Sequence, residues 1–425
     1  MNSIKAHSNR FIIAGLVVIQ LVALSIVALV GYELYTDWHD DSIEIYYVYS
    51  TRFLDGEMPF RDFAMEYPPL ALIAFCLPHL IAFGKELSID QYTNFYLFVN
   101  VLFSLIVSII VLSLFQKWQP KNRRIVEPIA LLTVALVICA PILPWRYDLF
   151  PALLTILSLY LLIINKPVAS GISIGIAVAA KLYPAVLIPV FMLYLLSKAD
   201  LRSLKRFIIG GGISATTLIP FIVLAPNSFT SFLSYHQQRG LEVESLMSGF
   251  ILLGKMVGII PATIVYNYTA FHLSSPYADI ILRWLPYVAI TLFAIIYASC
   301  YIQFKKAFTA NNKIPTDSLL AYSVLALLIF LITNKVFSPQ YIIWILPFFP
   351  LMRLRYASLF LIISFLTIMI FPVGFKLIID ANQLGIILLN LRNGLIVVLT
   401  LWIFIDYFPF SKRSSISEPA LSEEI

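Results

Sequence analysis

Long apolar runs alternate with short polar segments along most of the chain. The first run, residues 11–31, follows the charged start MNSIKAHSNR, and similar runs recur as far as residue 405. A helix needs about 20 apolar residues to cross the hydrocarbon core of a bilayer, so the pattern predicts an all-α, polytopic bundle of about twelve transmembrane spans. The predicted spans are 11–31, 92–116, 127–143, 149–164, 168–180, 183–197, 207–225, 280–302, 318–333, 341–352, 356–374 and 385–405.

Two long segments interrupt this rhythm. Residues 37–70 are crowded with acids and tyrosines, and they end at Pro68-Pro69, which cannot lie inside a regular helix but can open one. We therefore expect a first external loop at 32–91, in which a helix within 68–83 dips into the membrane, and a second external loop with short helices at 226–279. Both belong to one domain, residues 1–410, and the polar tail 411–425 is expected to be disordered and cytoplasmic.

The distribution of Lys and Arg orients the bundle. Lys5 and Arg10 flank the first run, and the stretch from Lys117 to Arg124 holds four basic residues. Cytoplasmic loops carry an excess of Lys and Arg, so the N-terminus and the 117–124 stretch are both expected inside the cell. That arrangement requires segment 68–83 not to cross, and it places both long loops on the extracytoplasmic face of the plasma membrane.

Composition narrows the class of protein. Hydrophobic residues make up 60% of the chain and charged residues only 12%, about half the charged fraction of a soluble protein. The net charge of +6 comes from loop Lys and Arg, so it does not indicate nucleic-acid binding. The three cysteines lie in or beside apolar runs and are expected to be buried hydrophobic side chains.

Four cations break the charge rule, because the topology puts them at external ends of spans. Ionisable groups in or at a bilayer are costly and are usually functional. Cations suit the phosphate of an anionic, lipid-linked substrate, and a nearby carboxylate suits removal of a proton from an attacking hydroxyl. The candidate phosphate-binding residues are Arg146, Lys181, Arg239 and Lys335, with His236 beside them, and the candidate supporting residues are Glu66, Tyr67, Asp148, Glu244 and Gln340.

Each candidate also has a structural interpretation. Arg146 and Asp148 could pair with each other, Lys181 could be a turn residue that reaches the outer surface, and Glu244 could lie on a solvated face. The run from Asp37 to Asp41 could bind a divalent cation, but it lacks a standard ligand spacing. We therefore predict no metal and no cofactor.

Five stretches of the chain, in order, resemble glycosyltransferase family 87. They are YYVYSTRFLDGEMPFRDFAMEYPPLAL (46–72), RYDLFPALLTILSL (146–159), GISIGIAVAAKLYPAVLIP (171–189), YHQQRGLEVES (235–245) and NKVFSPQYIIWILP (334–347). The resemblance implies the GT-C membrane architecture and an inverting transfer of a hexose, often mannose, from a polyprenyl phosphate to an acceptor on the outer face.

The resemblance also implies a catalytic aspartate in the first external loop. In the family pattern this aspartate stands seven residues before the second tyrosine of a Y-x-x-Y pair. Counting back from Tyr49 reaches Ser42, and the nearest aspartates are Asp41 and Asp40. Asp41 is the first candidate for the general base and Asp40 the second.

Two other functions use the same kind of substrate. A transporter or flippase of polyprenyl-linked sugars would carry charges at mid-membrane and often an internal repeat, and neither is visible here. A polymerase or ligase of surface polysaccharide would share the lipid carrier without the five stretches. The expected partners are a polyprenyl-phosphate sugar, a lipid or glycan acceptor and membrane lipids, with no nucleic acid.

Overall fold

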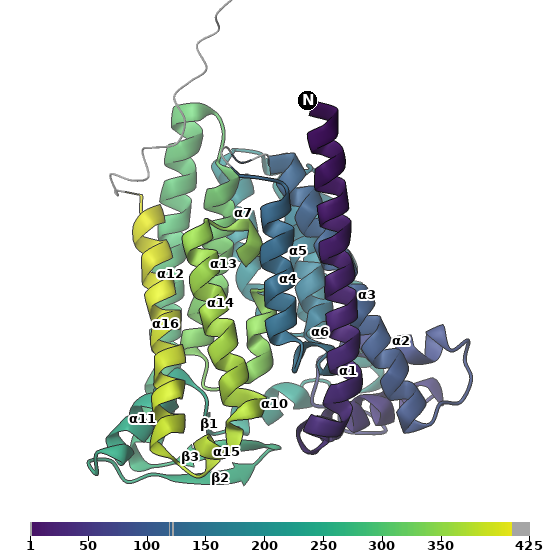
Figure 1. The fold of residues 1–425 in the computed structure, drawn as a ribbon, viewed down its shortest axis with the longest axis vertical. Coiled ribbons are helices and arrows are strands. Elements are labelled where there is room, and N and C mark those ends of the chain that lie inside the picture. The colour runs from purple at the N-terminus through teal and green to yellow at the C-terminus, as the bar shows by residue number, and fades with distance from the viewer. Residues whose placement is uncertain (1, 119, 121–122, 410–425) are drawn as a thin grey trace, which may run out of the picture.

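A computed structural model describes residues 2–118, 120 and 123–409, without the side chains of residues 2–8, 10, 28–29 and 31–41 in the first helix. The predicted tail, 411–425, lies outside the described residues. The upright helices form a bundle with the N-terminus at one end (Figure 1). They are α1 (Asn2–Leu54), α3 (Ile89–Trp118), α4 (Val126–Cys139), α5 (Leu149–Ile163), α6 (Pro167–Ala180), α7 (Leu187–Ser197), α8 (Leu201–Thr216), α12 (Pro276–Asn311), α13 (Thr316–Thr333), α14 (Leu354–Ile368) and α16 (Gln383–Tyr407).

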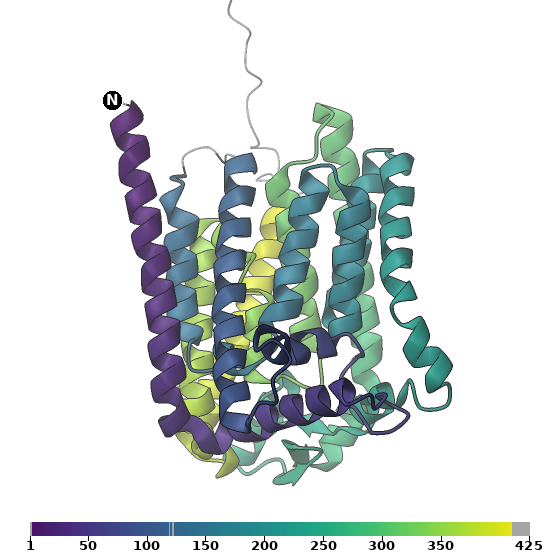
Figure 2. The same cartoon turned by 90° about the vertical axis from the view of Figure 1, so that its right-hand side faces the viewer.

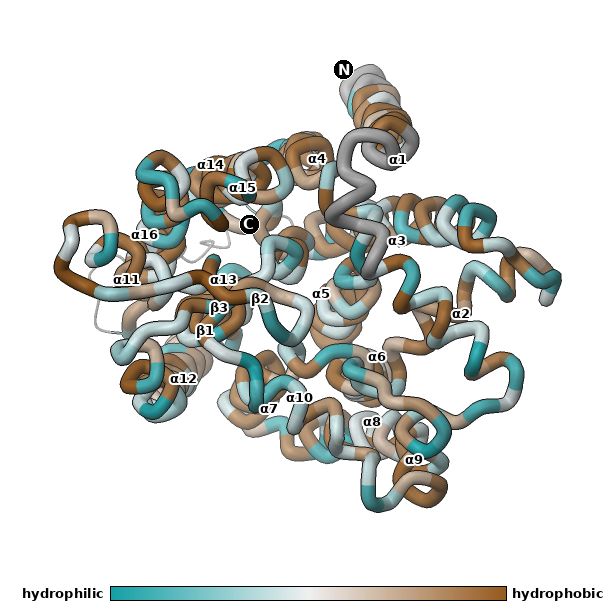
Figure 3. The backbone as a smooth tube through the Cα atoms, turned by 90° about the horizontal axis from the view of Figure 1, so that it is seen from below, coloured by the Kyte–Doolittle hydropathy of each residue, from teal (hydrophilic) through white to brown (hydrophobic). Residues whose placement is uncertain are grey.

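Short elements gather at the opposite, lower end of the bundle. Seen from below, the strands cross the middle of this end and α10 lies beside them (Figure 3). The short elements are α2 (Ala71–Ile81), α9 (Ile219–Leu224), α10 (Ser231–Gln238), α11 (Leu246–Met256), α15 (Phe375–Ile379), β1 (Leu241–Glu242), β2 (Thr263–Asn267) and β3 (Ala270–Ser274). The remaining described elements are four 3₁₀ turns, η1 (Leu143–Trp145), η2 (Tyr183–Val186), η3 (Pro339–Trp344) and η4 (Phe349–Leu351), and one π-helical segment, η5 (Met369–Val373).

Among the described residues, five helices are long and apolar enough to cross a membrane. They are Ile89–Trp118, Pro276–Asn311, Thr316–Thr333, Leu354–Val373 and Gln383–Tyr407. Seven shorter apolar helices accompany them, including Phe11–Val27 and Leu149–Ile163. The predicted polytopic helical fold is confirmed, whereas the number of spans, about twelve by apolar runs, stays a prediction.

Helices α6 and α8 pack without intervening side chains at two points. A Cβ at Gly171 would lie 2.0 Å from the Phe207 carbonyl oxygen, and a Cβ at Gly210 would lie 2.1 Å from the Val168 carbonyl oxygen. Neither position can therefore hold alanine without moving a backbone. Small residues at such contacts are typical of helix pairs in membranes, where close backbone approach supplies the packing energy.

The acidic segment predicted as a loop from residue 37 is helical in its first half. Helix α1 continues to Leu54, and the first helix-breaking residue after Tyr32 is Gly56, whose φ is +94°. The run EIYYVYSTRFL holds neither Gly nor Pro, so nothing in it ends the helix. The last turns of α1 lie across the lower end of the bundle (Figure 2). Helix α2 then begins at Ala71, directly after the two prolines.

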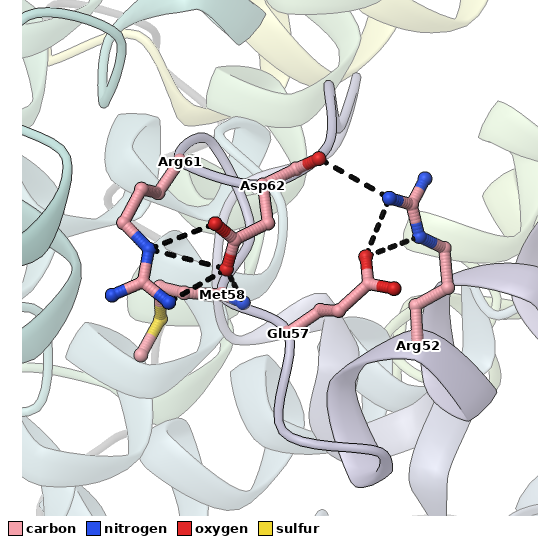
Figure 4. Close-up of polar contacts among 5 residues, drawn as sticks. All are labelled: Arg52, Glu57, Met58, Arg61 and Asp62. Atoms are coloured by element: carbon pink, nitrogen blue, oxygen red, sulfur yellow. Dashed lines mark hydrogen bonds and ion pairs between the residues drawn. The ribbon is translucent and has the colours of Figure 1, made fainter.

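Two ion pairs hold the turn that follows α1. Arg52 bonds the Glu57 carboxylate at 2.6 Å, and Arg61 bonds Asp62, which also accepts a 2.7 Å hydrogen bond from the Met58 backbone N–H (Figure 4). The hydrogen bond from Arg61 lowers the pKa of Asp62 to about 2. These two acids serve the turn itself.

The second external segment contains a sheet in addition to the expected short helices, so the prediction of an all-α chain was incomplete. Strands β2 and β3 form an antiparallel hairpin, and β1 adds to the other edge of β3. Tyr268 and Thr269 take positive φ values of 48° and 54° at the hairpin turn. Two residues in the left-handed region match the twist of a two-residue hairpin turn, and the β-branched and aromatic residues of β2 suit a strand.

Two predicted spans are not single helices. Residues 341–352 form parts of η3 and η4, because Pro347 and Pro350 remove backbone donors from the run, and most of its side chains are buried. Residues 207–225 divide into α8 and α9, with Pro220 at the start of the second helix. The apolar pattern thus located apolar segments there without indicating their backbone shape.

Candidate functional site

A cavity of about 1070 Å³ opens among the lower elements. It is lined by side chains from the end of α1, from the turns after α4 and α6, from α10, from the sheet and from the segment after α13. All five predicted phosphate-binding residues line it, with four of the five predicted supporting residues: Arg146, Lys181, His236, Arg239, Lys335, Glu66, Tyr67, Glu244 and Gln340. Residues distant in the sequence therefore converge on one space.

The two candidate bases fall where side chains are not described. Asp40 and Asp41 belong to α1, but their side chains lie outside the described residues. The next residue, Ser42, lines the cavity and accepts a hydrogen bond from the Arg146 guanidinium. Residues 40 and 41 thus immediately precede a residue on the cavity wall.

The fifth supporting residue, Asp148, lies behind the wall in a closed cluster. Its side chain is 1% exposed, and it accepts 2.6 Å hydrogen bonds from both the Lys181 ammonium and the Trp344 indole. The Lys181 ammonium also lies 4.6 Å from the centre of the Tyr147 ring. Asp148 starts α5 and Lys181 ends α6, so the pair ties together two helices and the η3 turn. The alternative in which Arg146 and Asp148 form the pair is not what the structure shows, because the partner of Asp148 is Lys181.

An aromatic stack adjoins this cluster. Trp344 lies between Tyr183 and Tyr341, with ring centres 4.1 Å and 3.8 Å away. Tyr183, Tyr341 and Trp344 all line the cavity. Flat apolar faces beside charged groups give the cavity a surface suited to a ring with both apolar and polar edges.

A second ion pair is longer and has fewer hydrogen bonds. The Arg239 guanidinium and the Glu242 carboxylate are 3.5 Å apart, and the same Glu242 oxygen accepts a 3.0 Å hydrogen bond from Ser338. The other Glu242 oxygen and the Arg239 Nε are buried with no hydrogen-bond partner among the described residues. Burial raises the pKa of Glu242 and the Arg239 charge opposes this rise.

Lys335 fixes the end of α10. Its ammonium donates to the backbone carbonyls of Gln237 and Arg239 at 2.8 Å and 2.6 Å, and its own carbonyl accepts from the Glu242 N–H at 2.9 Å. A cation at a helix C-terminus satisfies carbonyls that have no partner within the helix. Lys335 therefore positions Arg239 and still contributes positive charge to the cavity.

His236 stands on α10 beside Glu66. Burial, and to a smaller extent the positive charges of Arg239 and Lys181, lower the pKa of His236 to about 4. The imidazole is therefore neutral at physiological pH. It can donate or accept a hydrogen bond there, but it does not supply a charge to a phosphate.

The comparison with protein-family models finds glycosyltransferase family 87 over residues 65–333. This match covers more than half of the chain. The chain belongs to glycosyltransferase family 87. It is accordingly a membrane glycosyltransferase, with a sugar donor and an acceptor as substrates. A comparison with curated proteins found no match.

Membership in family 87 does not by itself assign the cavity residues, since part of the wall lies beyond the matched region. Ser42 precedes the match, and Lys335, Gln340, Tyr341 and Trp344 follow it. Within the described residues, no group of three or more His, Cys, Asp or Glu side chains has a metal-binding arrangement.

Sequence reasoning missed a buried arginine beside the site. Arg392 of α16 is fully buried, donates a 3.0 Å hydrogen bond to the Glu244 backbone carbonyl, and lies over the Phe337 ring at 4.0 Å. Asn393 donates to the Ser245 carbonyl at 3.2 Å. The signal was an arginine in the middle of an apolar run, which indicates an inward-facing functional or structural residue.

Proposed function

We propose that this family 87 enzyme transfers a hexose, with mannose as the first candidate, from a polyprenyl phosphate to a hydroxyl of a lipid or glycan acceptor. The transfer takes place on the extracytoplasmic face of the plasma membrane and inverts the anomeric configuration. The observation that carries the proposal is the cavity, which combines cations, carboxylates, stacked aromatic rings and an apolar side.

The cavity's lining suits a lipid-linked phosphate. Arg146 and Arg239 present guanidinium groups, which bind phosphate oxygens in a bidentate manner. On another side the cavity meets Leu282 and Pro286 of α12 and Phe330 of α13. An amphiphilic donor can place its phosphate at the cations and its chain along this apolar side.

The reaction needs one base and one stabilised leaving group. The aspartate, Asp41 or Asp40, takes the proton of the acceptor hydroxyl as the oxygen attacks the anomeric carbon. The bond between that carbon and the phosphate oxygen breaks, and its electron pair leaves with the polyprenyl phosphate. The positive groups stabilise the charge that develops on the phosphate, and no cofactor takes part.

The basic residues at the other end of the bundle support this orientation. Helix α3 runs from the lower end to Lys117 at the end that carries the N-terminus, and α12 ends at the same end beyond Lys305 and Lys306 (Figures 1 and 2). An excess of Lys and Arg marks the cytoplasmic side, which favours an extracytoplasmic cavity.

The test is an assay of purified enzyme with polyprenyl-phosphate mannose and other polyprenyl-phosphate hexoses. Asp41→Asn keeps the shape of the side chain but cannot accept a proton, so we expect its rate to fall by about 10²–10⁴ with donor binding retained. Asp40→Asn is expected to be mild, and Asp55→Asn, on the exposed turn, is the control. If the large loss of rate appeared in Asp40→Asn and the mild one in Asp41→Asn, the base would be Asp40. Flipping of intact donor across vesicles without transfer would overturn the proposal in favour of a flippase.

A further inference from the structure

Two carboxyl groups lie side by side in the wall of the cavity. Glu242 ends β1 and Glu244 lies in the turn that follows it; they are 6% and 3% exposed, and both line the cavity. A 3.0 Å hydrogen bond from the Ser245 N–H to the Glu242 carbonyl closes this turn and keeps the two residues close together. Carboxyl groups offer no positive charge to a phosphate, so this part of the wall is suited to an uncharged polar group of the substrate.

The Glu244 carboxyl group has fewer hydrogen-bond partners than that of Glu242. Glu242 has Arg239 and Ser338 as partners. For Glu244, the described residues supply no hydrogen bond to the carboxyl group, and Oε1 is buried without a partner. Arg392 and Asn393 bond the Glu244 backbone carbonyl, so they hold the residue in place without occupying its side chain. A buried polar group without a partner is costly, and a ligand hydroxyl would remove that cost.

The surroundings favour the protonated form of Glu244. The charged and titratable groups around the two carboxyls are Glu242 itself, Arg239, Arg392, His272 and Lys335. Burial raises the pKa of Glu244, the Arg392 charge opposes this rise and the Glu242 charge adds to it, and the resulting pKa is about 8. A protonated carboxyl group both donates and accepts, as a sugar hydroxyl does.

The aromatic stack lies on the same wall. Ser338, the partner of Glu242, directly precedes η3, which carries Tyr341 and Trp344. A hexose ring against Tyr341 would therefore have the Glu242 and Glu244 carboxyl groups along one edge, and the donor phosphate would lie toward the cations.

We propose that Glu244 binds a hydroxyl group of the transferred hexose and thereby sets which hexose the enzyme accepts. This inference rests on the proposed function. A site built to hydrogen-bond a substrate hydroxyl strongly rejects an analogue that lacks it, because its own polar group is then left unpaired.

The experiment compares wild type, Glu244→Ala and Glu244→Gln on the accepted donor and on deoxy-hexose donors that each lack one hydroxyl. We expect Glu244→Ala to lower kcat/KM for the accepted donor by about 10- to 100-fold. On one deoxy donor the loss should vanish, while the KM for the acceptor stays unchanged. Glu244→Gln, which keeps a donor and an acceptor, should retain most activity. Wild-type kcat/KM should fall as pH rises through about 8, and that of Glu244→Gln should not.

Controls separate this inference from the proposed function. Glu57→Ala, at the surface pair with Arg52, should match wild type. A Glu244→Ala variant within twofold of wild type, a loss equal on all donors, or a change confined to the acceptor KM would overturn the inference and leave the proposed function standing. Wild-type protein inactive with every polyprenyl-phosphate hexose would overturn both. Should Glu244→Ala fail to fold, the pH profile of Glu244→Gln decides alone.

Discussion

Two ion pairs lie at or just behind the cavity wall, and they differ in how many of their polar atoms have hydrogen-bond partners. In the Asp148–Lys181 pair the atoms are 2.6 Å apart, and Trp344 takes a further bond to the same carboxylate oxygen. In the Arg239–Glu242 pair they are 3.5 Å apart, and one buried atom on each side has no partner in the part of the chain that the structure describes. A complete pair stabilises the fold, whereas an incomplete pair retains hydrogen-bonding capacity for a ligand. This difference in hydrogen bonding distinguishes residues that stabilise the fold from residues that are available to bind a substrate.

The largest effect on stability should come from breaking the complete pair. Asp148→Ala leaves the Lys181 ammonium without its carboxylate, and removing one partner of a buried pair costs about 3–5 kcal/mol. Thermal unfolding of the detergent-solubilised protein measures the loss. Asp148→Asn combined with Lys181→Met should recover much of it, because no isolated charge remains. The exposed pair gives the control, since Glu57→Ala should cost less than about 1 kcal/mol. A melting temperature unchanged in Asp148→Ala would remove the distinction between the pairs.

A smaller effect, on binding, should come from the incomplete pair. Arg239→Ala removes a charge-assisted contact to the donor phosphate, which corresponds to about 1.5–3 kcal/mol, or at least a tenfold rise in donor KM. Lys335→Ala should act in the same direction, because Lys335 holds the backbone of Arg239. Both variants should melt within a few degrees of wild type. Full activity of both at limiting donor would mean that other residues bind the phosphate.

The smallest effect should appear in the pH dependence of stability. The pKa of His236 is lowered to about 4 in the folded protein, so between about 6.5 and 4 the unfolded chain binds more protons at this residue. Its contribution is therefore fully present above pH 6.5 and is lost as the pH falls toward 4. We expect His236→Gln to lose less stability than wild type over that interval, measured by unfolding at pH 7 and pH 5. An identical pH dependence would show that His236 is less buried in solution.

The sequence predicted which residues gather in the cavity better than it predicted the local backbone structure and the side-chain pairs. Arg146, Lys181, Arg239 and Lys335 stood out because cations at external span ends are rare, and that argument depends only on topology. The pairing of Asp148 with Lys181 rather than Arg146 depends on which side chains meet in three dimensions, and spacing along the chain does not determine it.

The prediction of secondary structure failed where one sequence pattern is compatible with two structures. Residues 42–54 were expected in a loop because they are acidic and aromatic, yet the run contains no helix breaker and its residue types are all tolerated in helices. The hairpin at 263–274 was missed because its turn, Tyr268-Thr269, has none of the usual Asn, Asp or Gly residues. Arg392 was missed because it lies within an apolar run, outside the polar ends where candidates were sought.

The short helices of the bundle have a consequence for how this protein is made and studied. Helices α5, α6 and α7 contain 15, 14 and 11 residues. At 1.5 Å per residue they extend only roughly 16–22 Å, against about 30 Å of hydrocarbon. Helix α5 contacts η3, α6 contacts α8, and α7 contacts α8, α12 and α13, all of which are synthesised after them. A nascent chain that stops near residue 199 would lack those neighbours, so insertion of this region should wait for later segments. Reporter fusions to truncated chains would then misreport the topology, and labelling of single cysteines in the full-length protein is the appropriate method.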